Sequence, residues 1–546
     1  MSRAILRASA GAALFLVLSV LLLPYAGIQD DEALFTTPLY LHIEKQFRVR
    51  ILHHDVFFMV MSYLGALKTW LFAPLFAAFG ANRWSLRLPV ALAGAMTVFI
   101  FYLFAERSIG TRAALLGSLL LATDPVFLLT NLIDWGPVAL EHLLLVTAIF
   151  CLLRFGQSAL SRSNDPAQPE EPKWERNCLI VGFLCLGLAL WNKAIFVWSL
   201  AGLSVAGLLV FSPEIRKLMT SRRLRLGAVA FLIGALPLIV YNLRHKNATL
   251  SESAHVDLRG PAAKWPQLES ALNGSSLFGY MVSEEWRPQV KPATSVVGRA
   301  STWLRERLGE RLRTGFYYAI GILILAAPLW WRSRAARFSL VFCAVTWLAM
   351  AVTKDAGGSA HHVILLWPFP VLFAAIAVTR IAEFRGGRIV AAALSVALVA
   401  MNLVVLNQYL VQFERNGPAE TFTDAIYPLS DDLQAFPGRP IYVIDWGMLN
   451  VLGFLHQGKL DLKAGSEPLM TDAPSEPQQK ALGRMVEDSR AVFVGHVAGE
   501  EMFPKVNERL ARAAEGFGFR KEVLRTVADS NGRPRFEIFR FVPAGG

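Results

Sequence analysis

Long apolar runs separated by short polar connectors make up the first three quarters of the chain. Eleven runs are long enough to cross a bilayer as helices. They lie at roughly 8–26, 84–104, 113–131, 136–153, 177–192, 195–212, 226–242, 315–331, 338–353, 362–379 and 388–408. The pattern predicts a polytopic α-helical membrane protein with about eleven transmembrane helices. The first run exceeds the short apolar core of a signal peptide, so we expect a retained span.

The segment "VFFMVMSYLGALKTWLFAPLFAAFG", residues 56–80, is also apolar enough to span. A single crossing here would move every later connector to the other side of the membrane. We therefore expect a juxtamembrane or re-entrant helix pair on the outer side, interrupted near Pro74, with Lys68 snorkelling to the membrane surface. A hairpin that crosses the membrane twice is the alternative.

Basic residues in the connectors predict the orientation. With the N-terminus in the cytoplasm, every basic cluster between spans lies on the inner side, as the positive-inside rule requires. These clusters fall within residues 3–7, 107–112, 154–176, 216–225, 332–337 and 380–388. We expect a bacterial inner-membrane protein whose outer, periplasmic side receives the loops 27–83 and 243–313 and everything after about 409.

The composition agrees with this class of protein. Hydrophobic residues make up 54% of the chain and charged residues 18%, and the mean hydropathy is +0.42. The net charge of +12 is explained by the basic connectors, so no nucleic-acid partner is expected. The four cysteines lie in apolar stretches without the spacing of a metal or redox motif, which indicates core residues.

Residues 410–546 have a different pattern from the membrane domain, residues 1–409. Short β-rich runs, "RPIYVID", "RAVFVGHV" and "RFEIFRFV", alternate with helical stretches near 446–457, 475–488 and 504–516, and "DSNGRP" is typical of a hairpin turn. The pattern predicts a small soluble α/β domain on the outer side. It contains no P-loop, dinucleotide-binding fingerprint, CxxC or GxSxG motif.

The acids Asp30, Asp31 and Glu32 directly follow the first span on the outer side. Adjacent carboxylates raise one another's pKa, and an apolar environment raises it further, so such a group can act as a base near neutral pH. A solvated cluster that marks the end of the span is the structural alternative. Asp134, in the next outer turn, is a second acid that a shared site could use.

Glu141 and His142 lie about two turns into the fourth span, where charged groups are costly and often functional. A structural pairing of Glu141 with a neighbouring helix is the alternative.

Basic groups also reach the outer side, and such groups bind phosphate. They are Lys193, Arg244, Lys354, His361 and His362. Taken singly, each Lys or Arg could instead be a snorkelling anchor. We expect no cofactor. A divalent metal is the minority alternative, because a zinc site needs further ligands at defined spacing.

Several of these motifs together resemble the C-type glycosyltransferase superfamily. They are the Asp-Glu after the first span, "RWSLRLPVALAGAMTVFIFYLFAERSIGTRAALLGSLLLATDPVFLLTN" with the Asp in the following outer turn, "GLALWNKA" and "HHVILLWPFP". The resemblance covers roughly residues 1–410. It is strongest to the branch of protein O-mannosyltransferases and bacterial aminoarabinose transferases that act on lipid A.

The resemblance implies a glycosyltransferase that moves a sugar from a polyprenyl-phosphate donor to a lipid, glycan or protein acceptor, generally with inversion. Asp31 would act as general base or orient the acceptor, and Asp134 would be the second acid. His361 or His362 would help to bind the lipid-linked phosphate. The chain lacks the usual Pro-Pro of the first loop, and the doubled acid leaves both Asp30 and Asp31 as candidates for the base.

Two other classes compete with this interpretation. A transporter or lipid flippase would typically show internal repeats and ionisable groups at mid-depth, whereas no clear repeat is present and the charges gather at one side. A non-enzymatic assembly or sensor protein would leave the acids unexplained.

Overall fold

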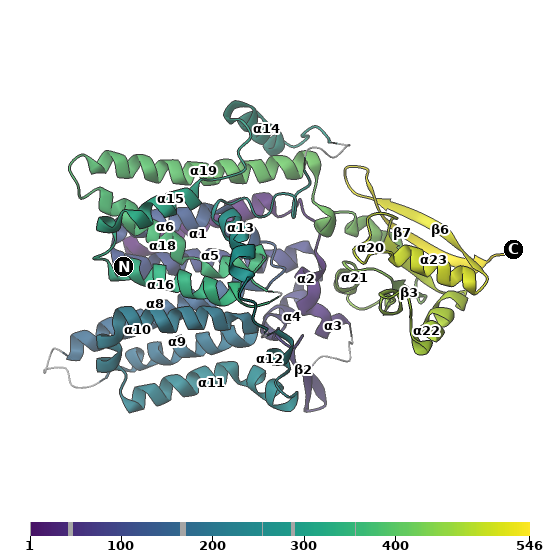
Figure 1. Cartoon of the computed structure of the whole chain (residues 1–546), viewed down its shortest axis with the longest axis horizontal. Helices are drawn as coiled ribbons and strands as arrows, with labels where there is room; N and C mark the ends of the chain where they lie inside the picture. Colours follow the sequence, from purple (N-terminus) through teal and green to yellow (C-terminus); the bar gives the residue numbers. More distant parts are fainter. Residues whose placement is uncertain are drawn as a thin grey trace.

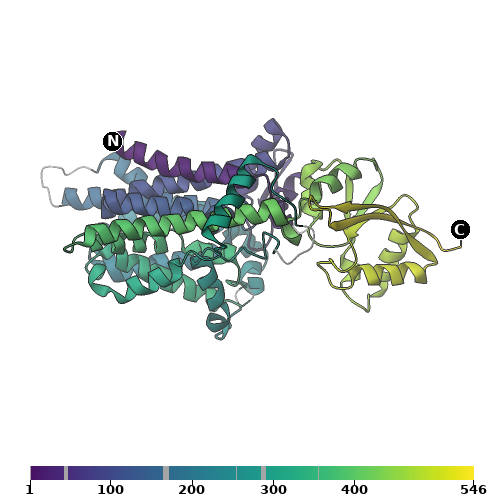
Figure 2. The same ribbon diagram turned by 90° about the horizontal axis from the view of Figure 1, so that it is seen from above.

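The structure is a computed structural model of the chain, and it describes residues 2–41, 47–163, 171–253, 255–284, 290–354 and 356–545. A helical bundle makes up most of it, and a small α/β domain follows at one end (Figure 1). The N-terminus lies at the opposite end of the bundle from this domain in both views (Figure 2).

Within the described residues, eight helices are long and apolar enough to cross a membrane. They are α1 (Ser2–Leu22), α5 (Arg83–Ile109), α8 (Val138–Ser163), α9 (Lys173–Asn192), α10 (Val197–Leu218), α11 (Ser221–Arg244), α16 (Arg334–Ala351) and α19 (Gly387–Asn416). The predicted class of a polytopic helical membrane protein is confirmed.

The remaining three expected spans are also helical, but each is broken. They are α6 (Thr111–Thr123) with α7 (Pro125–Thr130), α15 (Phe316–Leu325) with the 3₁₀ turn η3 (Ala327–Leu329), and α17 (Ala360–Val363) with η4 (Ile364–Leu366) and α18 (Phe369–Ile381). Proline lies at or just after each break, where it removes a backbone donor and disfavours helix in the preceding residue. The last pair bends by 45° and counts as a ninth span if it crosses as one unit.

Most of the segment 27–83, which the sequence predicts to be the first outer loop and which keeps that name below, lies at the end of the bundle that carries the α/β domain (Figure 1). It contains α2 (Asp30–Ala33), η1 (Leu34–Thr36), α3 (Thr37–Tyr40), the hairpin β1 (Phe47–Ile51) and β2 (His54–Met59), and α4 (Leu67–Phe79). The expected helix pair broken near Pro74 is wrong, because α4 continues through Pro74 as one helix. Thirteen residues of helix reach about 20 Å, which is too short to cross a bilayer.

The second long loop adds α12 (Ala248–Ser253), α13 (Gly260–Leu272) and α14 (Val296–Leu308). Helix α14 packs along α19, where the Ser301 hydroxyl donates to Asn407 Oδ1 at 2.7 Å.

The C-terminal domain is a five-stranded sheet with strand order β4-β3-β5-β7-β6. Its elements are α20 (Ile426–Leu433), β3 (Pro440–Val443), α21 (Leu449–Leu455), β4 (Asp461–Ala464), α22 (Glu476–Glu487), β5 (Val492–His496), α23 (Val506–Gly516), β6 (Phe519–Ala528) and β7 (Pro534–Pro543). The β3 strand pairs in parallel with β4 and β5, and β7 pairs antiparallel with β5 and β6. The three predicted strands and three predicted helices are present, and β4 and β6 were not anticipated.

Alternation along β5 separates two cores on the two faces of this sheet. Phe493 packs with residues of α22 and α23, whereas Val492 and Val494 pack with α20, α21 and residues of the first outer loop. One face of the domain therefore shares its hydrophobic core with the membrane part of the chain.

Candidate functional site

The acidic triplet forms the first turn of the short helix α2. Gln29 caps this helix: its side-chain oxygen accepts the Glu32 backbone N–H at 3.1 Å, and Glu32 accepts the Gln29 N–H at 3.4 Å. Successive residues of an α-helix point about 100° apart. The three acids consequently point in different directions and meet different partners.

Glu32 is held by Arg87 of α5. The guanidinium donates to both carboxylate oxygens, at 2.7 and 2.8 Å, and also to the carbonyls of Leu23, Ala26 and Gly27. Both side chains are almost fully buried. This arrangement ties the start of the first outer loop to the membrane domain, and it leaves Glu32 no free oxygen for catalysis.

Asp30 points toward the C-terminal domain. Its two oxygens accept the backbone N–H of Asn450 at 3.1 Å and the Asn450 side-chain amide at 2.7 Å. Burial raises the pKa of Asp30 to about 7, and the negative charge of Asp31 adds to this, while the bonds from Asn450 lower it. Asp30 is therefore engaged in an interdomain contact.

Asp31 is half-buried and is the least constrained of the three acids. Its one hydrogen bond within the described part of the chain is a long one, 3.5 Å from the Gln29 amide. Burial raises the pKa of Asp31, whereas Gln29 and the charge of Lys193 lower it. Burial raises the pKa of Tyr63, and it raises the pKa of Tyr280 to about 12; the negative charge of Asp31 adds to both shifts.

Lys193 brings a buried positive charge to the same place. Its ammonium donates to the Gly136 carbonyl at 2.9 Å. Burial lowers the pKa of Lys193, and the nearby charges of Glu141, Asp134 and Asp31 oppose this shift. Lys193 thus provides a positive charge near acids of three segments, namely α2, the turn at Asp134 and α8.

The first outer loop docks directly on the turn that contains Lys193. The Tyr63 carbonyl accepts the N–H of Ala194 at 2.9 Å, and the Gly65 N–H donates to Asn192 at 3.1 Å. A side chain at Gly65 would collide with the backbone of Trp191. Glycine at this position therefore permits the close approach of the two segments.

Asp134 is paired with Lys68 of α4 at 2.8 Å, and both side chains are buried. Asp134 also caps α8, since its other oxygen accepts the N–H groups of Val138 and Ala139 at 2.7 and 3.3 Å. The expectation that Lys68 snorkels to the membrane surface is wrong. Its charge is neutralised inside the protein, and Asp134 has a structural role whatever else it does.

The two histidines lie beside the Asp134 turn and pack against each other. His361 Nδ1 accepts the indole N–H of Trp135 at 2.9 Å, and its ring fills the space that a side chain at Gly136 would occupy. His362 Nδ1 accepts the Gly357 N–H at 3.0 Å.

Glu141 and His142, in the first turns of α8, differ in their surroundings. His142 connects Asn131 and the Ile364 carbonyl, at 3.1 and 2.9 Å, so it links three segments of the bundle. Glu141 is fully buried, and neither of its oxygens has a hydrogen-bond partner among the described residues.

Arg244 and Lys354 lie outside this cluster. Arg244 is exposed and stacks on Phe47, and Lys354 is exposed with its backbone N–H bonded to His255. Neither has a described contact with Asp31, Asp134 or Lys193. In the residues that the structure describes, no group of three or more His, Cys, Asp or Glu side chains is placed to hold a metal ion.

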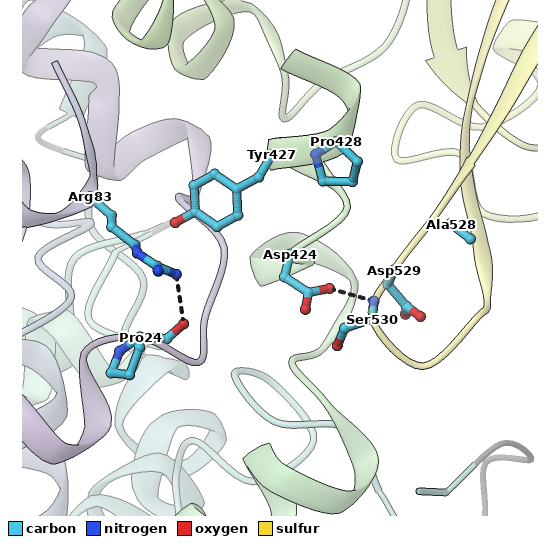
Figure 3. A pocket seen from close by; sticks show the side chains of 8 residues that line it. All are labelled: Pro24, Arg83, Asp424, Tyr427, Pro428, Ala528, Asp529 and Ser530. Atoms are coloured by element: carbon cyan, nitrogen blue, oxygen red, sulfur yellow. Dashed lines mark hydrogen bonds between the residues drawn. The ribbon is translucent and has the colours of Figure 1, made fainter. Parts of the chain in front are cut away.

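A separate polar cavity of about 270 Å³ opens between the bundle and the C-terminal domain (Figure 3). On the bundle side, Arg83 lies over the Tyr427 ring and donates to the Pro24 carbonyl at 3.1 Å; on the side of the C-terminal domain, Asp424 accepts the Ser530 N–H. The acids and bases described above are not among its lining residues.

The sequence also matches a known family over part of its length. Residues 65–241 match the model of the dolichyl-phosphate-mannose-protein mannosyltransferase family. Comparison with curated proteins gives no match.

Solved structures resemble the whole chain. ArnT from Cupriavidus metallidurans bound to undecaprenyl phosphate is 14% identical, with a TM-score of 0.55 and coverage of 98% of this chain and 97% of that one. The Archaeoglobus fulgidus oligosaccharyltransferase in the apo form is 12% identical, with a TM-score of 0.52 and coverage of 96% and 74%. The archaeal oligosaccharyltransferase AglB with an inhibitory peptide and a dolichol-phosphate is also 12% identical, with a TM-score of 0.52 and coverage of 93% and 71%.

The protein is thus a multi-pass membrane protein with a C-terminal α/β domain and the fold of the C-type glycosyltransferases. The resemblance recognised in the sequence is confirmed, in sequence over residues 65–241 and in fold over almost the whole chain.

Proposed function

We propose that the protein is a membrane glycosyltransferase that moves a sugar from a polyprenyl-phosphate donor to an acceptor, with Asp31 as the general base. The observation that carries this proposal is the different engagement of three adjacent acids. Glu32 is occupied by Arg87 and Asp30 by Asn450, while Asp31 is half-buried with a raised pKa and the positive charge of Lys193 nearby.

The donor class is supported by the fold neighbours, one bound to undecaprenyl phosphate and another to a dolichol-phosphate. A lipid phosphate is already a competent leaving group. The protein must therefore position it, balance its charge and remove the acceptor's proton. Lys193 and His361 both contact the turn that follows Asp134, and His362 packs against His361. These three residues would bind the phosphate of the donor.

The reaction is a single displacement. The acceptor oxygen attacks the anomeric carbon as the bond from that carbon to the phosphate oxygen breaks. The acceptor's proton passes to the Asp31 carboxylate, and polyprenyl phosphate leaves with the bonding electrons. Lys193 stabilises the negative charge that develops on the phosphate.

The site lies at the end of the bundle that bears the C-terminal domain, which we place in the periplasm of a bacterial inner membrane. This orientation is supported by the basic connectors between α5 and α6, between α8 and α9, and between α10 and α11. By connectivity they lie at the same end of the bundle as the N-terminus.

The test uses the full-length protein in nanodiscs, with undecaprenyl-phosphate donors carrying radiolabelled mannose or 4-amino-4-deoxyarabinose and an envelope extract as acceptor. We expect the wild type to transfer label and Asp31→Asn to lose at least about 100-fold in rate, because a general base contributes about that much or more. Full activity of Asp31→Asn would refute the base assignment. Movement of labelled lipid across the bilayer without a glycosylated product would instead favour a flippase.

A further inference from the structure

Helix α21 of the C-terminal domain packs against the loop that carries the acids. Phe454 of α21 packs edge-on against Phe76 of α4, with ring centroids 5.0 Å apart, and also against Tyr40 at 6.2 Å. Leu41 fills the space left by Gly453, where any side chain would collide with it. The helix therefore fits closely against the first outer loop.

This contact is part of a continuous hydrophobic core. Buried residues of α2, its flanks and α5 pack in one cluster with buried residues of α21 and the sheet. The cluster includes Ile28, Ala33, Phe35, Leu86 and Val90 from the membrane side and Met448, Val451, Leu452, Phe454 and Val494 from the C-terminal domain. The two parts are consequently held as one body at this point rather than joined by a linker alone.

The polar contact at the edge of this core reaches the acidic triplet itself. Asn450 donates from its backbone and its side chain to the two oxygens of Asp30, and both residues are more than nine-tenths buried. A buried carboxylate that lost these bonds would be left unsatisfied at a substantial cost. The direction in which Asp30 points is therefore fixed by the C-terminal domain.

Helix α2 has only four residues, and so short a helix has almost no stability of its own. Its orientation depends on its anchors: Arg87 holds Glu32 on one side and Asn450 holds Asp30 on the other. Asp31 lies between the two anchored residues. Its direction is set when both anchors are in place.

We propose that the C-terminal domain is part of the catalytic unit, and that Asn450 is a positioning residue that holds Asp30 and thereby aims Asp31 at the acceptor. This inference rests on the proposed function. The domain has further anchors on the bundle, including the 2.7 Å bond from the Gly27 N–H to the Phe422 carbonyl. Loss of the Asn450 side chain should therefore disturb the direction of Asp31 without releasing the domain.

The experiment is a mutant cycle in the nanodisc transfer assay, with the donor that the wild type uses. Asn450→Asp places a carboxylate against Asp30 and should lower kcat by at least about 10-fold while KM for the donor changes by less than about twofold, because small misplacements of a catalytic group cost rate. The double variant Asp30→Asn with Asn450→Asp restores one donor and one acceptor. It should return kcat to within about threefold of the wild type.

Gln479→Glu is the matched control, because it adds the same charge to an exposed position of the same domain and should leave kcat unchanged. Resistance to trypsin reports whether the domain stays docked. If Asn450→Asp is cleaved, Asn450→Ala replaces it, since it removes the side-chain bond without adding a charge.

Unchanged kcat in an intact Asn450 variant, or failure of the double variant to recover, would overturn the positioning role. Absence of transfer by the wild type would count against the proposed function instead. Activity of Asp31→Asn equal to the wild type would count against Asp31 as the base. The three failures are distinguishable in one assay.

Discussion

Arg87 and Glu32 form a two-pronged ion pair, at 2.7 and 2.8 Å, that is almost completely shielded from solvent. The same guanidinium also donates to three backbone carbonyls just after α1, those of Leu23, Ala26 and Gly27. All three nitrogens of the guanidinium are therefore hydrogen-bonded. The pair fixes where the first outer loop leaves the bundle.

Replacement of Arg87 should therefore destabilise the protein. Arg87→Ala leaves Glu32 and three carbonyls without their donor, and loss of one partner of a buried ion pair costs about 3–5 kcal/mol. Thermal unfolding in detergent measures this loss. Arg107→Ala, an exposed position on the same helix, is the control and should change the unfolding temperature little. Equal unfolding temperatures for the two variants would contradict the anchoring role.

Lys68 and Asp134 offer a second test of a buried pair. Lys68→Met leaves the Asp134 charge buried without its partner, and we expect a loss of stability of about 3–5 kcal/mol. Lys68→Met with Asp134→Asn removes both charges, while the Asn oxygen can still accept the N–H groups that begin α8. The double variant should recover most of the loss in thermal unfolding. No recovery would mean that Lys68 stabilises the site through other contacts.

The architecture could be predicted from sequence because each part of it has a strong local signal. Apolar runs indicated the helices. Alternation in "RAVFVGHV" indicated the strand β5. The sheet was only partly predicted, because "DLKA" of β4 and the mostly exposed β6 lack a clear apolar pattern.

The partners within the site could not be predicted, because they depend on contacts between distant segments. Asp30 and Asn450 are 420 residues apart, and the sequence contains no local sign of their contact. For Lys68 and Arg87 the sequence does indicate that a partner exists, because a charged residue inside an apolar segment is usually paired. The sequence does not show that this partner is Asp134 for Lys68 and Glu32 for Arg87.

The pH dependence of transfer provides a test of Asp31. A base must be deprotonated, and burial raises the pKa of Asp31 above that of an exposed aspartate. Activity should therefore fall as the pH drops through this raised pKa, at a higher pH than an ordinary aspartate would give. The dependence of kcat/KM on pH in nanodiscs measures this acidic limb. A rate that stays constant down to about pH 4 would exclude a base with a raised pKa.

The raised pKa of Asp30 predicts how the stability of the protein depends on pH. Its pKa is raised from 3.8 to about 7 in the folded protein, so between these values the folded state holds more protons on this side chain than the unfolded state. The free energy of unfolding should consequently fall as the pH rises across this window, by an amount on the order of a few kcal/mol, with the contribution of Asp30 complete below the lower value.

Asp30→Asn removes the titrating group, so its thermal unfolding temperature should depend less on pH than that of the wild type across the same window. The Asn side chain can still accept the backbone N–H of residue 450, which keeps the domain contact in place. Glu476→Gln, at an exposed position of α22, is the control and should follow the wild-type curve. Parallel curves for Asp30→Asn and the wild type would show that Asp30 is ionised at no cost in the folded protein.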